Sequence, residues 1–118
     1  MIARATAVAV TCAALVAAAP AAAHVGIKSY TPKRGSTVSR SLERVKVTFK
    51  GRITDGKLTV RDADGDKVSI GKGRVVNNKR TVRVRLKSGL SRGSYTASLS
   101  ALHSDGHVMT RSWNFKLN

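Results

Sequence analysis

Acidic, sulfhydryl and aromatic side chains are all scarce in this chain of 118 residues. It has six Asp and Glu against 22 Lys and Arg, and one Trp, two Tyr and two Phe. The shortage of acids leaves a formal net charge of +16, which favours attraction to anionic envelope polymers or lipids over neutral partners. Specific recognition of nucleic acid is not expected, because few aromatic rings are left over from the core as platforms for stacking bases.

No hydrophobic run is long enough to span a membrane, which takes about 20 residues. The longest, Ala5–Ala19, follows the basic Arg4 and precedes a small-residue cleavage site at Ala21–Ala23. This order predicts that residues 1–23 are a secretory signal peptide and that the mature chain begins at His24. The protein is therefore expected outside the bacterial cytoplasm, secreted or in the periplasm or cell envelope. The alternative is an uncleaved N-terminal anchor.

The single cysteine, Cys12, lies inside the predicted signal, so the mature chain is expected to lack disulfides. Thr11 before it is not the small residue that a lipoprotein site requires. Residues 24–118 are long enough for one domain with a modest core, whose rigidity must come from that core or from a metal. Arg4 is the only charge lost with the signal, so the mature chain keeps +15. That charge either binds an anionic partner or only keeps the surface soluble.

Apolar residues alternate with polar ones in five segments of the mature chain, which is typical of strands with one buried face. No segment has a sustained helical period. Several short strands separated by turn residues predict an all-β fold, a small β-sandwich or barrel in a single domain. The residues predicted to face inward are Val45, Val47, Phe49, Leu58, Val60, Val82, Val84, Leu86, Tyr95, Ala97, Leu99, Ala101, Trp113, Phe115 and Leu117.

Two segments resemble ligand-binding loops without fulfilling their patterns. Asp62, Asp64 and Asp66 begin like a calcium loop, but the positions that require Gly and Glu hold Lys67 and Gly73. We therefore expect a solvated hairpin turn there. The basic segment 71–74 lacks the spacing and the strand-to-helix context of a phosphate-binding loop.

The three histidines, His24, His103 and His107, are confined to the predicted mature N-terminus and one five-residue segment. A free terminal amine and the imidazole of His24 can chelate one metal ion. His107 would add a third nitrogen and Asp105 a carboxylate oxygen, and both lie on one face of an extended backbone. Nitrogen and oxygen donors of this kind suit Cu(II). His103 is a possible extra ligand, although a surface histidine beside the site is the favoured interpretation.

These residues resemble the CopC family of exported copper-resistance proteins. The match begins at His24-Val-Gly-Ile-Lys-Ser29 and ends with Ser104-Asp105-Gly106-His107 and Phe115. The resemblance implies a Greek-key β-sandwich or barrel, Cu(II) as the bound metal, and His24, Asp105 and His107 as its ligands. Some members also have a Met-rich Cu(I) site, which is not expected here because Met109 is the only methionine of the mature chain. A CopD-like membrane copper importer is the partner that the resemblance suggests.

The sequence therefore predicts a protein that sequesters or carries copper and is not an enzyme. Two other functions stay open. An N-terminal histidine with a second histidine on a β-sandwich also resembles the copper site of lytic polysaccharide monooxygenases, which are larger. A cationic surface-binding module with incidental histidines is the other alternative.

Overall fold

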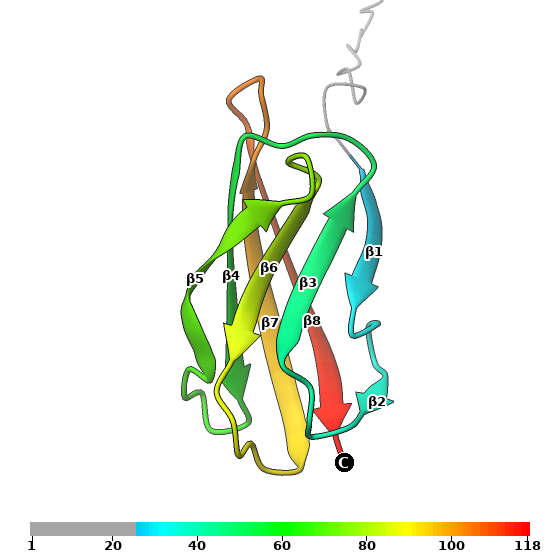
Figure 1. Cartoon of the computed structure of the whole chain (residues 1–118), viewed down its shortest axis with the longest axis vertical. Helices are drawn as coiled ribbons and strands as arrows, with labels where there is room; N and C mark the ends of the chain where they lie inside the picture. The colour runs from blue at the N-terminus through cyan, green and yellow to red at the C-terminus, as the bar shows by residue number, and fades with distance from the viewer. Residues whose placement is uncertain (1–25) are drawn as a thin grey trace, which may run out of the picture.

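Two four-stranded β-sheets make up the computed structural model, which describes residues 26–118 (Figure 1). No helix in this part of the chain is long and apolar enough to cross a membrane. The strands in chain order are β1 (Ile27–Thr31), β2 (Thr37–Val38), β3 (Arg44–Phe49), β4 (Asp55–Asp62), β5 (Ser69–Val76), β6 (Thr81–Leu86), β7 (Gly93–Leu102) and β8 (Val108–Leu117).

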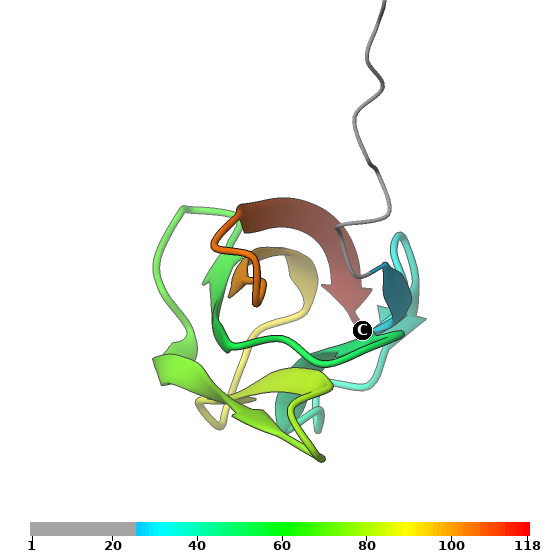
Figure 2. The same ribbon diagram turned by 90° about the horizontal axis from the view of Figure 1, so that it is seen from above.

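The sheets have the strand orders β1-β3-β6-β5 and β2-β8-β7-β4. Every pairing is antiparallel except that of β2 with β8, which is parallel. Hairpins join β5 to β6 and β7 to β8, whereas the other long connections cross between the sheets, as in Greek-key sandwiches. Seen from above, the two sheets curve around a common interior (Figure 2). The predicted all-β sandwich is confirmed.

The interior is filled by the residues that alternation placed on the inward face, and all of them are buried. In β3, for example, Val45 and Val47 are fully buried while Arg44 and Lys46 are exposed. Burial of an aliphatic side chain stabilises the fold by about 1.5–3 kcal/mol, so this pattern holds the sheets face to face. The few apolar side chains that are exposed singly do not weaken this packing.

Aromatic side chains connect loops to the core through hydrogen bonds and ring packing. Trp113 donates its indole N–H to the Pro32 carbonyl oxygen at 2.9 Å and packs on Tyr30, with 4.6 Å between ring centroids. The Tyr95 hydroxyl donates to the Ser91 carbonyl oxygen four residues earlier, like the tyrosine corners of other sandwiches. Burial, with a smaller contribution from the Asp62 carboxylate, raises the pKa of Tyr95 above its ordinary value.

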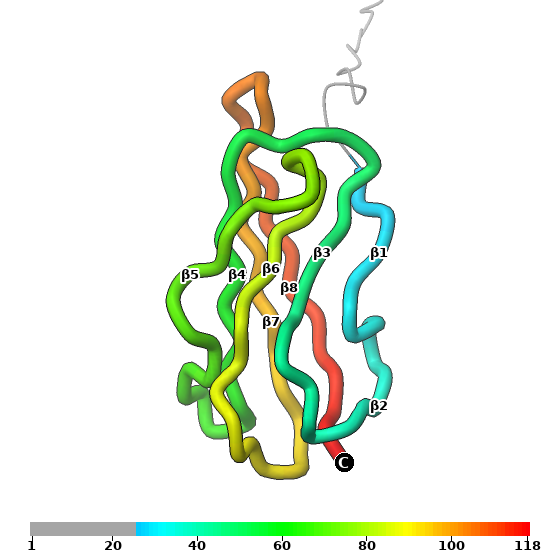
Figure 3. Tube along the Cα trace, viewed as in Figure 1, coloured from blue at the N-terminus to red at the C-terminus, as the bar shows by residue number. Residues whose placement is uncertain are grey.

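Strand β5 was not predicted from the sequence, because its side chains do not alternate. Its pairing with β6 shifts register between Ile70 and Arg74, and its trace bows outward there (Figure 3). A Cβ on Gly73, whose φ is +86°, would lie 2.9 Å from the Arg83 carbonyl oxygen. The glycine therefore permits a close backbone approach that a larger residue would block.

Candidate metal centre

The segment between β7 and β8 forms a tight turn that carries two of the predicted ligands. The His103 N–H donates to the His107 carbonyl oxygen at 2.9 Å, and the Gly106 N–H donates to the His103 carbonyl oxygen at 2.9 Å. Gly106 has a φ of +92°, which favours glycine. Asp105 and His107 therefore lie in a turn rather than on an extended strand, and the glycine between them allows that turn.

The Asp105 carboxylate holds His107 through two contacts. Its Oδ1 accepts the His107 backbone N–H at 2.9 Å, and its Oδ2 lies 3.0 Å from His107 Nδ1. When Nδ1 carries the proton of this bond, the ring lone pair is on Nε2, which is the nitrogen that a metal would bind. The His107 side chain is 66% exposed and that of Asp105 31%, so a metal ion can approach both.

His103 is not a surface residue, so the favoured interpretation of it as a surface histidine beside the site is wrong. It is 2% exposed. It follows β7 on the same parity as the buried Leu99 and Ala101, and so continues the inward row of that strand. This parity was visible in the sequence. Among the described residues, the side chains of His103, Asp105 and His107 do not form a group with ligand atoms close enough for one ion.

His24 lies outside the described residues, so its place is an expectation only. Gly26, the first described residue, accepts the Lys50 N–H at 2.8 Å. In the same β3–β4 connection the Thr54 N–H donates to the Leu102 carbonyl oxygen at 2.8 Å, just before His103. The β3–β4 connection is therefore hydrogen-bonded both to the beginning of the described chain and to the base of the Asp-Gly-His turn. Figure 1 shows the beginning of the described chain and the β7–β8 turn at the same end of the sandwich.

That end of the molecule also carries cations. The Arg52 guanidinium donates to the Asn78 side-chain oxygen at 3.0 Å, and that of Arg80 donates to the Lys50 carbonyl oxygen at 3.3 Å. A free metal cation is repelled by such surroundings, so binding there requires strong local donors. Asp55, at the beginning of β4, is an acid at the same end, and its carboxylate accepts the Gly56 N–H at 2.8 Å.

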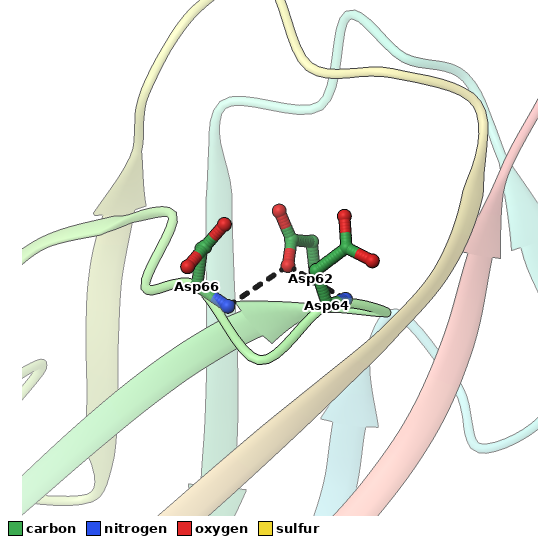
Figure 4. Close-up of side chains that lie close together, drawn as sticks. All are labelled: Asp62, Asp64 and Asp66. Atoms are coloured by element: carbon green, nitrogen blue, oxygen red, sulfur yellow. Dashed lines mark hydrogen bonds between the residues drawn. The ribbon is translucent and has the colours of Figure 1, made fainter.

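The cluster of Asp62, Asp64 and Asp66 lies at the other end of β4. Their carboxylate oxygens come within 4.8 Å of one another, which makes them the one such group of three in the described part of the chain (Figure 4). Oδ1 of Asp62 accepts the backbone N–H groups of Asp64 at 3.0 Å and Asp66 at 2.9 Å. This is the bonding of an Asp-capped turn, so the predicted solvated turn is confirmed, but it leads from β4 to β5 in the other sheet and does not join a hairpin pair of strands.

Comparison with known proteins identifies the relatives of this chain. The sequence model of the CopC domain matches residues 27–118. CopC from Methylosinus trichosporium OB3b has a similar structure, with a TM-score of 0.68 and 23% identity over 80% of this chain and 94% of that one. PcoC, a methionine-rich copper resistance protein from Escherichia coli, gives 0.65 and 23% over 81% and 100%. No curated protein sequence matches the chain. At these identities the structures establish a shared fold.

Proposed function

This chain belongs to the CopC family, and on that premise we propose that it binds Cu(II) outside the cytoplasm and sequesters or carries it. Proteins of the family bind and carry copper and are not enzymes. The observation that supports the proposal most strongly is the Asp105–His107 pair, held in an exposed turn by two hydrogen bonds. A CopD-like membrane importer is the partner that we propose for delivery.

The proposed ligands are the terminal amine and imidazole of His24, Nε2 of His107 and the Asp105 carboxylate. Removal of residues 1–23 by signal cleavage would create the amine. His24 is two residues before Gly26, and two extended residues span about 7 Å, so the amine can reach the end of the sandwich that carries the turn. His103, being buried, is proposed to pack beneath the turn rather than to bind the ion.

This donor set suits Cu(II), which prefers nitrogen and oxygen ligands in tetragonal geometry. The amine and the imidazole must be deprotonated to bind, so the affinity should fall steeply as the pH drops through their range of about 8 to 6.5. Because the protein surface repels cations, copper is expected to enter a tight chelate or to arrive in neutral or anionic complexes.

The proposal is tested by titrating Cu(II) into protein that begins at His24, in competition with a chelator of known affinity. His107→Ala removes one of few nitrogen donors and is expected to weaken binding at least tenfold. Val108→Ala is the matched control, because Val108 is the exposed neighbour of His107 and offers no ligand atom. Wild-type affinity in His107→Ala would contradict the proposal.

A further inference from the structure

The four strands of the β1-β3-β6-β5 sheet contain many cations and no acid. Figure 1 looks onto this sheet, whereas β4, in the other sheet, carries Asp55 and Asp62 beside its own cations. Against a net charge of +2 on the strands of the other sheet, the strands of this one carry +7. Its charged residues are Lys28, Arg44, Lys46, Lys72, Arg74, Arg83 and Arg85.

Strand register places these cations directly opposite one another. Arg44 pairs with Arg85, and Lys46 pairs with Arg83, which in turn pairs with Arg74. Strands are about 4.8 Å apart, so the last three form a row about 10 Å long. Like charges opposite one another destabilise a sheet. Within residues 26–118 none of these side chains forms an ion pair, so the repulsion is not relieved internally.

Five of the cations line a shallow groove between β3, β6 and the outward bow of β5. We name it the basic groove, and its charged residues are Arg44, Lys72, Arg74, Arg83 and Arg85. Four of these are arginines, and each planar guanidinium group can donate two parallel hydrogen bonds to the oxygens of one phosphate. The groove thus offers a line of phosphate-binding groups with no carboxylate among its lining residues.

We propose that the basic groove binds a linear polyanion whose charge is carried by repeated phosphate groups. A chain can lie along the groove and contact all five cations, whereas a planar lipid surface cannot enter a concave site. Ile70 is the one exposed large apolar side chain lining the groove, 53% exposed, and gives no apolar patch for insertion into a bilayer. None of the residues that line the groove is aromatic, so nucleotide bases would find no aromatic ring to stack on there.

Binding of a polyanion by the basic groove needs no copper, so it can be measured on metal-free protein. Metal-free protein beginning at His24 is titrated with long-chain inorganic polyphosphate, with phosphatidylglycerol vesicles and with an oligothymidylate of matched charge. Arg83→Gln/Arg85→Gln removes two cations from the groove. Lys57→Gln/Lys116→Gln removes two exposed lysines from the other sheet and serves as the control.

Polyphosphate is expected to bind most tightly, with a slope of log K against log salt of about −3.5 for five contacted phosphates. The groove variant should lower the magnitude of that slope by about 1.4 and weaken binding at least tenfold in low salt, while the control stays close to wild type. The groove variant should also melt at a higher temperature than wild type in low salt, since opposed like charges are gone. Unchanged copper affinity in it would show that the metal site is intact.

Three results would overturn the inference. Equal losses in the groove variant and the control would mean that net charge alone attracts the polymer. Preferred binding to vesicles, or to the oligonucleotide, would assign the surface to a membrane or to nucleic acid. No binding of polyphosphate in low salt would leave the groove without a polyanion of this class.

Discussion

Replacing Asp105 by Asn should separate copper binding from folding. The change removes one negative charge and the acceptor that faces His107 Nδ1 at 3.0 Å, but an amide oxygen can still accept the His107 backbone N–H. Since the turn is exposed and one of the two hydrogen bonds between Asp105 and His107 survives, the free energy of unfolding should fall by less than about 1 kcal/mol.

Copper binding should respond far more strongly to the same change. The substitution removes an anionic ligand, and it also removes the group that orients the imidazole and holds the proton on Nδ1. Loss of such a partner weakens metal binding by about 10- to 100-fold, or about 1.4–2.7 kcal/mol.

The assay pairs a chelator competition for Cu(II) with thermal unfolding of the metal-free protein. Asp55→Asn is the matched control, because Asp55 lies at the same end of the sandwich and its carboxylate also accepts a backbone N–H. It should change copper affinity by much less than tenfold. Wild-type affinity in Asp105→Asn would contradict a ligand role for Asp105. An equal loss in Asp55→Asn would mean that Asp105 acts only through its negative charge.

Two further predictions concern stability. Ser69 is 3% exposed and its hydroxyl accepts the buried Val60 N–H at 3.0 Å, so Ser69→Ala should cost about 1–3 kcal/mol in urea unfolding, whereas the exposed Ser88→Ala should cost little. Equal midpoints for both variants would contradict this. The pKa of Tyr95 is raised in the folded state. The contribution of its un-ionised hydroxyl to the free energy of unfolding is therefore fully present below about pH 10 and is lost as the pH rises through the folded pKa. Tyr95→Phe, which lacks the bond to Ser91, should be about 1 kcal/mol less stable at neutral pH yet lose less stability than wild type between about pH 9 and pH 11; a parallel decline would refute it.

Local alternation was enough to predict most of the sandwich. Val82 and Val84 or Trp113 and Phe115 face inward because a strand has a side-chain period of two, and that period can be read from one segment alone. The bulge of β5 broke the pattern, since its conformation depends on glycines with positive φ and on a close approach to β6.

The candidate site was predictable only in part. The spacing of Asp105 and His107 indicated that their side chains would lie close together, and they do, but in a turn rather than on an extended strand, and with a contact between Asp105 Oδ2 and His107 Nδ1 that the spacing did not predict. Burial of His103 was not predicted, although it shares the inward parity of Ala101, because it lies just beyond the last residue of β7, where alternation alone does not show whether the inward row continues. Register was not predictable at all: nothing near Arg83 in the sequence shows that Lys46 and Arg74 lie on either side of it, because that arrangement depends on which strands become neighbours.

The central claim is that signal cleavage produces a copper ligand at His24, and electron paramagnetic resonance tests it most directly. Spectra and Cu(II) affinities are compared for protein that begins at His24 and for protein with one alanine placed before it, with circular dichroism to verify the fold. We predict that the first binds one Cu(II) with a tetragonal, nitrogen-rich signal and that the extension abolishes tight binding while the fold is kept. The same spectrum and the same affinity in both proteins would show that the terminal amine of His24 is not a copper ligand.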